Sequence, residues 1–215
     1  MNIKTFCFNP FQENTYVVSD ESGECMIIDC GAFYDSERQA LTDYIDGNGL
    51  KPVMLVATHA HLDHNFGNDL ITSRYGIHPW VSAKDEVLMS GLDRQSMLFL
   101  NSPLKHPQPS VGRYFADNEE IVFGQHTFKV IPTPGHTPGS VFLYCQEEQL
   151  AFSGDTLFHM SIGRTDFELG SYDDIIHSLQ TIGELLPDNT RIYCGHGPAT
   201  TIRQEKDCNP YISTS

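Results

Sequence analysis

The chain has 215 residues, of which 13 are basic and 28 acidic, so its formal net charge is −15. Such an acidic surplus disfavours nucleic acids and anionic membranes as partners, because both require a basic face. Hydrophobic residues make up 40% of the chain, which is enough for a substantial core. The length fits one compact domain, and we expect a single domain over residues 1–215.

The cysteines are spread along the chain without a C-x-x-C pair, and four of them lie in or beside apolar runs. This pattern predicts free thiols in a reducing compartment rather than a disulfide framework. The N-terminal residues lack the apolar stretch of a signal peptide, and no run has the length of a membrane helix. We therefore expect a cytoplasmic protein, and the sequence leaves its oligomeric state open.

The first half of the chain alternates short apolar runs with helical segments. Strands are predicted at 3–8, 15–19, 25–29, 53–57 and 80–81. Helices are predicted at 35–46, at about 65–74 and, as one continuous helix, at 84–100. The proline-rich residues 101–113 are expected to form a loop that could overhang a functional site.

The second half contains the remaining strands and the most regular helix. Strands are predicted at 121–123, 127–131, 141–144, 150–152 and 191–194, and a helix at 172–186. Ser171 fits the N-cap of this helix and Pro187 its end. Two blocks of strands with helices between them predict an α/β chain with two mixed sheets, each covered by helices.

Seven candidate metal ligands lie on four short segments, and each segment follows an apolar run. They are His59, His61, Asp63, His64, His136, Asp155 and His196. Ligands at the ends of several strands can converge on one edge of a packed scaffold. Two cations about 3.5–4 Å apart need such a set of fixed donors. The sequence therefore predicts a dinuclear metal site.

The spacing of these residues suggests how they divide between two metals. His59 and His61 are two residues apart, which places both imidazoles on one face of an extended segment. We assign His59, His61 and His136 to one metal. The other is assigned Asp63, His64 and His196. Asp155 is predicted to bridge the two metals through its two carboxylate oxygens.

This donor set predicts a particular chemistry. Imidazole and carboxylate donors suit zinc, iron or manganese, and we expect two zinc ions, with iron or manganese as alternatives. Two cations lower the pKa of a shared water towards neutrality, which makes hydroxide available for hydrolysis of an activated acyl bond. Asp63 and Asp155 are the predicted catalytic carboxylates, with Asp63 also orienting the hydroxide.

Three further residues are candidates for supporting roles. Arg164 could bind a substrate carboxylate or phosphate, or form a salt bridge with Asp166. His159 closely follows Asp155 and could line the cleft. Asp29 ends a predicted strand and could support a metal-bound histidine.

The four ligand segments resemble the motifs of the metallo-β-lactamase superfamily. They read Thr-His-Ala-His-Leu-Asp-His from Thr58, Thr-Pro-Gly-His-Thr-Pro-Gly-Ser from Thr133, Phe-Ser-Gly-Asp-Thr-Leu-Phe from Phe152 and Cys-Gly-His-Gly from Cys194. Within the superfamily the chain is most similar to the glyoxalase II-like hydrolases, particularly their short single-domain branch. The resemblance implies a four-layer αβ/βα sandwich with a dinuclear site at one edge. Carried over by position, it gives the same division of ligands.

The resemblance also implies an activity, with alternatives. The family reaction is hydrolysis of a small-molecule thioester such as S-lactoylglutathione, giving a hydroxy acid and a free thiol. Ordinary glyoxalase II has a C-terminal helical domain that supplies much of its glutathione pocket, whereas only residues 197–215 follow His196 here. The thiol carrier therefore stays open. Members with β-lactamase activity differ at the position of Asp155, which disfavours antibiotic hydrolysis.

Other functions remain open as alternatives to thioester hydrolysis. Ile162–Phe167 is similar to a segment that the short branch shares with the persulfide dioxygenases, which use one iron. The run from Gly195 to Ile202 favours the short hydrolase branch. A mononuclear iron persulfide dioxygenase, a hydrolase of another ester, lactone or phosphoester, and a non-catalytic metal-binding protein remain alternatives.

Overall fold

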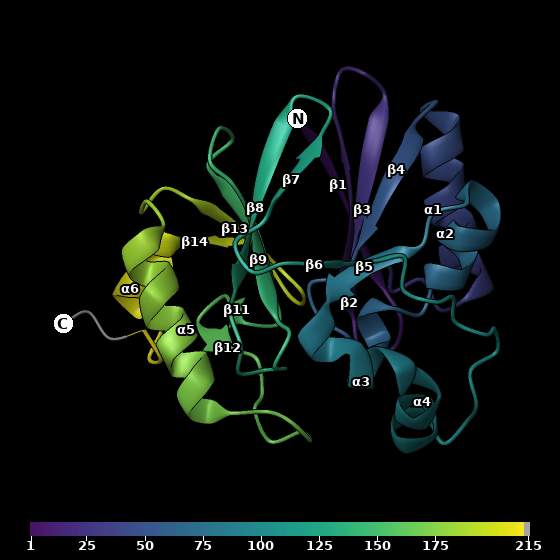
Figure 1. The fold of residues 1–215 in the computed structure, drawn as a ribbon. Coiled ribbons are helices and arrows are strands. Elements are labelled where there is room, and N and C mark those ends of the chain that lie inside the picture. Colours follow the sequence, from purple (N-terminus) through teal and green to yellow (C-terminus); the bar gives the residue numbers. More distant parts are fainter. Residues whose placement is uncertain (213–215) are drawn as a thin grey trace.

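Two blocks of strands form two six-stranded mixed sheets in the computed structural model, which describes residues 1–212. Helices cover the outer faces of both sheets (Figure 1): α1 and α2 lie on the first, and α5 and α6 on the second. The order of layers is helix, sheet, sheet, helix. This arrangement confirms the predicted four-layer αβ/βα sandwich with two mixed sheets.

The first sheet has the strand order β1-β2-β3-β4-β5-β6. Its strands are β1 (Asn2–Phe8), β2 (Glu13–Ser19), β3 (Glu24–Ile28), β4 (Lys51–Val56), β5 (Pro79–Ser82) and β6 (Arg113–Phe115). The pairs from β1 to β3 are antiparallel and those from β3 to β6 parallel. Parallel neighbours need a crossover connection; α1 (Asp35–Gly47) and α2 (Asn68–Tyr75) supply the first two.

The second sheet has the order β14-β13-β10-β9-β8-β7. Its strands are β7 (Glu120–Phe123), β8 (His126–Pro132), β9 (Val141–Cys145), β10 (Leu150–Gly154), β13 (Arg191–Cys194) and β14 (Thr200–Thr201). A small hairpin of β11 (Leu157–Phe158) and β12 (Ser161–Ile162) follows β10. The helix α5 (Tyr172–Leu185) crosses from there to β13, which pairs parallel to β10.

The strand directions bring the ligand segments to one edge. β3 and β4 are parallel, so the residues after their carboxyl ends are neighbours. β8 and β10 both pair antiparallel with β9, and β13 is parallel to β10. The carboxyl ends of all three therefore point the same way. The ligand-bearing turns of both sheets follow these carboxyl ends.

The two sheets bury a shared hydrophobic core between them. Phe128 on β8 and Phe152 on β10 pack there with Tyr16, Met26 and Val56 of the first sheet. Separate apolar clusters lie under α1 and α2 and under α5. A fourth cluster joins the turn after β4 to α3 (Glu86–Ser90) and α4 (Leu92–Leu100). The metal-site turn is thus packed against a helical pair at the end of the sandwich.

The structure differs from the sequence prediction in several elements. The prediction of one continuous helix at 84–100 is wrong: a 3-10 turn, Ala83–Asp85, precedes α3, and a break at Gly91 separates α3 from α4. The strand β6 begins at the end of the predicted loop, and α6 (Ile202–Cys208) was not predicted. Both are short, and the N-cap of α6 is Thr201, whose hydroxyl accepts from the Gln204 amide. Among residues 1–212, no helix is long and apolar enough to cross a membrane.

Truncating Phe128 tests the core between the sheets. Its side chain is fully buried, so Phe128→Ala is expected to lower the free energy of unfolding by about 3–5 kcal/mol. Val122 on β7 is exposed, and Val122→Ala is expected to change it by less than ~0.5 kcal/mol. Chemical denaturation measures both. Equal effects of the two variants would contradict this description of the core.

Candidate metal centre

Three of the predicted ligands come together from two turns. The donor atoms of His59, His61 and His136 all lie within 4.8 Å of one another. His61 Nδ1 is 2.8 Å from His136 Nε2. His59 and His61 follow β4 in the first sheet, whereas His136 follows β8 in the second. The first predicted triad is therefore a geometric group that spans both sheets.

A second group of three lies beside the first. The donor atoms of Asp63, His64 and His196 also lie within 4.8 Å of one another. His196 Nε2 is 3.2 Å from Asp63 Oδ2, and His64 Nε2 is 3.7 Å from the same oxygen. The rings of His59 and His64 have centroids 4.2 Å apart, so the two groups adjoin.

Asp155 stands between these two groups. Its Oδ1 is 3.3 Å from His64 Nε2, and its Oδ2 is 3.5 Å from both His136 Nε2 and His196 Nε2. The carboxylate therefore faces members of both triads at once. A bridging ligand requires this position.

Several polar atoms at the centre are buried without a hydrogen-bond partner. They are His59 Nε2, His64 Nε2 and Asp155 Oδ1. Leaving a buried polar atom unpaired is costly, and the three atoms face one another. Nitrogen and carboxylate oxygen are donors that zinc, iron and manganese accept. The residues present thus fit a metal centre.

In four of the candidate histidines, an oxygen atom lies within hydrogen-bond distance of the ring nitrogen Nδ1. His136 Nδ1 donates to the Arg164 carbonyl at 2.7 Å and His196 Nδ1 to the Phe11 carbonyl at 3.0 Å. His64 Nδ1 donates to Asp29 Oδ2 at 3.1 Å, and His59 Nδ1 lies 3.1 Å from Thr58 Oγ1. A proton fixed on Nδ1 leaves the Nε2 lone pair free for a metal.

Asp29 organises the turn after β4. Its Oδ1 accepts from the Thr58 amide at 2.7 Å, and its Oδ2 accepts from the Thr58 hydroxyl at 2.8 Å as well as from His64. Because the Thr58 hydroxyl donates to Asp29, its oxygen is available to accept from His59. One carboxylate thereby orients a histidine of each triad, in the supporting position predicted from sequence.

The site also depends on close backbone approach. A Cβ at Gly195 would collide with the Asp155 carboxylate and would lie 2.8 Å from His64 Cε1. Gly154 has a φ of +48° and lies against Thr58. Glycine meets both requirements without steric cost, so the two turns can bring Asp155 and His196 up to the other ligands.

A buried carboxylate that the sequence reasoning missed ties two ligand turns together. Asp85 accepts from the Ala60 amide at 2.9 Å, the Thr137 hydroxyl at 2.8 Å and the Gly139 amide at 2.6 Å. Burial raises the pKa of Asp85 despite these bonds. No local motif marks it, because an aspartate at the start of a helix is common on any surface.

Two side-chain amides complete this scaffold, and they were also missed. Gln95 on α4 accepts from the Leu62 amide at 3.0 Å and donates to the Ala60 carbonyl at 3.2 Å. Asn65 donates to the His61 carbonyl at 2.7 Å. The turn that carries four of the ligands is therefore held from α4 as well as from within.

The electrostatics of the centre favour a cation. Burial lowers the pKa of His59 well below its usual value and that of His61 to about 3, so both present neutral imidazoles. Burial also opposes charge on His196, but the adjoining Asp155 and Asp63 carboxylates raise its pKa to about 10, so a bound cation would take the place of the proton on its Nε2. Burial alone would raise the pKa of Asp155, yet His64 and His196 hold it well below its usual range.

A cleft of about 400 Å³ opens directly onto this centre. Its walls combine ligands of both triads with an apolar set: Phe11, Leu62, Phe99, Phe158, Ile162 and Phe167. Arg164 also lines the cleft, but Asp166 binds its guanidinium through two contacts of 2.7 and 2.8 Å. The salt bridge that the sequence allowed is thus present. Its role in substrate binding stays a prediction.

The structure places His159 outside the walls of this cleft. Its Nδ1 is 3.3 Å from Glu205 Oε1, and Glu205 is a buried residue of α6. Glu205 also accepts from the Met160 amide at 2.8 Å. The pair therefore anchors the β11–β12 hairpin to the C-terminal helix.

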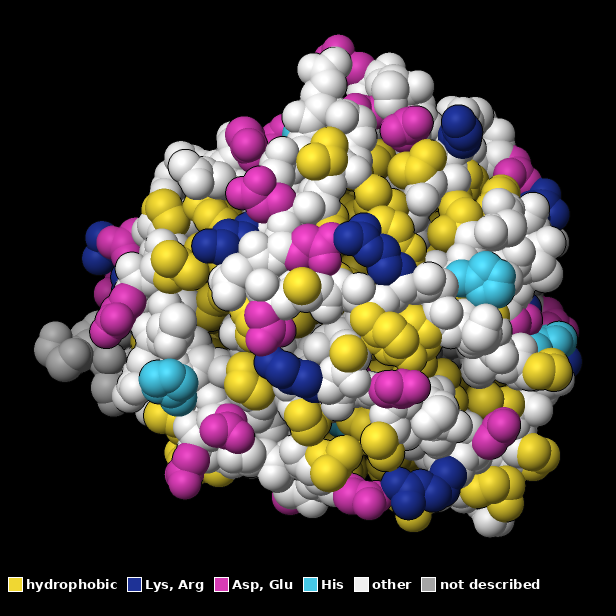
Figure 2. All heavy atoms as spheres, in the orientation of Figure 1, with side chains coloured by type: hydrophobic (Ala, Val, Ile, Leu, Met, Phe, Trp, Pro, Cys, Tyr) yellow, Lys and Arg dark blue, Asp and Glu magenta, His cyan; other side chains and the backbone are white. Residues whose placement is uncertain are grey.

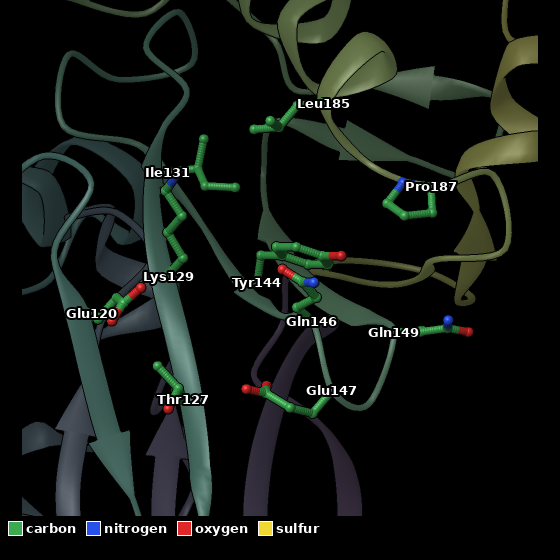
Figure 3. A pocket seen from close by; sticks show the side chains of 10 residues that line it. All are labelled: Glu120, Thr127, Lys129, Ile131, Tyr144, Gln146, Glu147, Gln149, Leu185 and Pro187. Atoms are coloured by element: carbon green, nitrogen blue, oxygen red, sulfur yellow. The ribbon is translucent and has the colours of Figure 1, made fainter.

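Another surface hollow lies away from the candidate metal centre. A hollow of about 430 Å³ on the second sheet is bordered by side chains such as Lys129, Tyr144 and Leu185 (Figure 3). None of the predicted ligands is among its walls.

On the face drawn in Figure 2, basic side chains are isolated and interspersed with acidic ones.

Comparison with known proteins gives matches over most of the chain. The family model described as the metallo-beta-lactamase superfamily matches residues 8–196. The hydroxyacylglutathione hydrolase GloC of Haemophilus influenzae is 35% identical over 218 aligned residues, covering 100% of this chain and 99% of that protein.

Solved structures give the same result. The structure described as BLEG-1 B3 metallo-beta-lactamase has a TM-score of 0.89 and 34% identity, covering 99% of this chain and all of that one. The di-iron-bound form of TTHA1623 has a TM-score of 0.85 and 31% identity, covering 98% of this chain and all of that one.

The fold, the donor clusters and these matches together define a metallo-hydrolase with its metal centre at the edge of a layered sandwich. The chain belongs to the metallo-β-lactamase superfamily. The resemblance noted in the sequence motifs is thereby confirmed.

Replacing Asp29 tests the support of the metal centre. Asp29→Asn is expected to weaken binding of a divalent cation by about 10–100-fold. The asparagine amide has a single acceptor oxygen, whereas the two Asp29 oxygens accept three hydrogen bonds, from the Thr58 amide, the Thr58 hydroxyl and His64. The fold should survive, since asparagine tolerates the positive φ of 52° at this position. Competition with a chromogenic chelator measures the affinity.

The matched control is Asp117→Asn, which removes a surface carboxylate paired with Lys84. It should leave the cation affinity unchanged. Equal affinities of the Asp29→Asn variant and the wild-type protein would show that Asp29 does not support the ligands.

Proposed function

We propose that this chain is a dinuclear metal-dependent thioester hydrolase of the glyoxalase II type, acting on a substrate such as S-lactoylglutathione. The observation that carries the proposal is the convergence of two donor triads and Asp155 at the base of one open cleft. The similarity to GloC of Haemophilus influenzae, which extends over the whole chain, supports the same substrate class.

The ligands would divide as the geometry groups them. His59, His61 and His136 would hold one metal, Asp63, His64 and His196 the other, and Asp155 would bridge them. Zinc is the proposed metal; the di-iron form of TTHA1623 supports iron as the alternative. Two such cations would supply Lewis acidity for the acyl oxygen and a water of lowered pKa.

The chain's own residues then position the reactants. Asp63 lines the open cleft and is more exposed than His59 or His64, so its carboxylate can orient the attacking water. The apolar walls exclude bulk water around the acyl carbon, which strengthens the electrostatic interactions there. The departing thiolate needs little protonation, because the pKa of a thiol is far lower than that of an alcohol.

Hydrolysis of β-lactams is a second candidate, because the BLEG-1 structure is described as a B3 metallo-beta-lactamase. Both reactions begin with attack of water on an activated carbonyl. The presence of Asp155 favours thioester hydrolysis within this family. A β-lactam panel run beside the thioester assay separates the two.

The decisive experiment pairs metal content with turnover on one sample. Elemental analysis should give close to two metals per chain, and S-lactoylglutathione should release free thiol. His136→Ala is expected to lower this rate by about 100-fold or more while circular dichroism stays unchanged. His177 is exposed on α5, and His177→Ala should leave the rate unchanged.

Other results would redirect the assignment. About one iron per chain, no thiol release, and oxygen uptake with a persulfide would indicate the dioxygenase. Full thiol release by the His136→Ala variant would remove the proposed ligand set. Bound metal without turnover on any ester or thioester would leave a non-catalytic metal-binding protein.

A further inference from the structure

A second, smaller pocket of about 260 Å³ adjoins the metal cleft. Its walls come from the turn after β4, from α3 and α4, and from the loop between β12 and α5, and they include His61, Leu88, Leu98, Phe99 and Phe167. Three of these residues, His61, Phe99 and Phe167, also line the metal cleft. The two spaces are thus parts of one groove.

Phe167 forms the boundary between the two spaces. Its ring centroid is 5.4 Å from that of His61 and also 5.4 Å from that of Phe99, in edge-to-face arrangements. The Arg164 guanidinium lies over this ring, 3.9 Å from its centroid. A group that leaves the metal centre past His61 therefore meets aromatic surface before it reaches the second pocket.

The second pocket is lined by apolar groups with neutralised charges at its edge. Leu88, Leu98 and Phe99 supply aliphatic and aromatic surface. The polar atoms of Gln95 are engaged by backbone groups. Arg94 Nη2 and Glu168 Oε2 pair at 2.6 Å, and both side chains are exposed. No unpaired cation among these lining residues is left to recognise an anionic ligand.

Exposed apolar side chains mark the mouth of this pocket. Leu98 is 74% exposed and Phe99 is 40% exposed on α4. Adjacent exposed apolar side chains of this size often mark a binding surface. On the face drawn in Figure 2, hydrophobic side chains gather along the lower edge, where Figure 1 places α3, α4 and the loop after β12.

We infer that this pocket is an acyl-chain subsite, so that the enzyme prefers thioesters whose acyl group carries an unbranched aliphatic chain. This inference rests on the proposed function. The reacting carbonyl carbon lies at the metal centre, and the acyl chain runs past His61 and along the surface of Phe99 and Phe167 into the pocket.

The size of the pocket assigns it to the acyl half of the substrate. Its volume of about 260 Å³ suits a medium-length aliphatic chain. A tripeptide thiol is bulkier, and it carries carboxylates that this neutral pocket would not stabilise. The thiol carrier therefore occupies the open part of the metal cleft.

The test varies the acyl chain and holds the thiol constant. Acetyl, butyryl, hexanoyl and octanoyl thioesters of N-acetylcysteamine are compared on the metal-loaded enzyme. The value of kcat/KM is expected to rise by up to about fourfold per methylene, which corresponds to ~0.8 kcal/mol per buried methylene. It should level off once the pocket is filled.

Two variants of α4 locate the effect. Leu98→Glu places a charge at the pocket wall and should lower kcat/KM for the hexanoyl thioester by about 10-fold or more, with a smaller loss for the acetyl thioester. Met97→Glu changes an exposed neighbour that is not a pocket wall. It should leave both rates unchanged. Because both positions are on the surface, neither change threatens the core.

Each contrary outcome has a distinct meaning. Equal kcat/KM across the acyl series would overturn the subsite and leave the hydrolase intact. A chain-length preference that Leu98→Glu does not alter would also overturn it, because the chain would then bind elsewhere.

If no thioester is hydrolysed, the proposed function fails, and calorimetry then decides the subsite by itself. The ligands are ketone analogues of the acetyl and hexanoyl thioesters, with a methylene in place of sulfur. Tighter binding of the longer analogue, lost in Leu98→Glu, would support the pocket assignment. Equal binding of the two would overturn it.

Discussion

The metal centre depends on one buried carboxylate, that of Asp29, at the carboxyl end of β3. It accepts hydrogen bonds from the Thr58 amide, the Thr58 hydroxyl and His64 Nδ1. Its own amide donates to the Val56 carbonyl at 2.9 Å, so the end of β3 is fixed to the end of β4. Because Thr58 also contacts His59, the tautomers of two ligands follow from this one anchor. A histidine can bind a metal only if the correct nitrogen is free, so the anchor is a chemical as well as a structural requirement.

The two sheets supply the rigidity that this arrangement needs. His59, His64 and Asp155 bring unpaired polar atoms into a buried space, which disfavours folding. The large apolar core between the sheets offsets that cost. Asp85 and Gln95 add the cross-links that the core itself cannot supply, since they bond backbone groups of the ligand turns. Stability and site geometry therefore come from different parts of the same sandwich.

Much of this site could be predicted from sequence, for a physical reason. Candidate ligands such as His59 and His136 closely follow apolar strands, so the motif and the strand pattern point to the same segments. The anchors had no such signal: Asp85 and Gln95 act through contacts between segments far apart in the chain. The break at Gly91 was missed because the apolar spacing of α3 and α4 stays roughly in phase across it. The placement of His159 against Glu205 depends on α6, a short helix whose pattern is weak.

Charged side chains are distributed unevenly in the cleft, between a base that favours a cation and an opening that offers apolar surface. Carboxylates concentrate at its base, where Asp63 and Asp155 stand among the histidines and favour a cation. Near the opening, the guanidinium of Arg164 is already paired with Asp166, and the walls are mostly aromatic. Under the proposed function, a substrate would gain binding free energy there chiefly from apolar contact, while the metals would act on its carbonyl. Selectivity among acyl groups would then change through a wall residue such as Phe99, whose ring packs against Phe167. Other walls are tied to a candidate ligand: the Phe11 carbonyl accepts from His196 Nδ1, and the Phe158 ring adjoins the His196 ring.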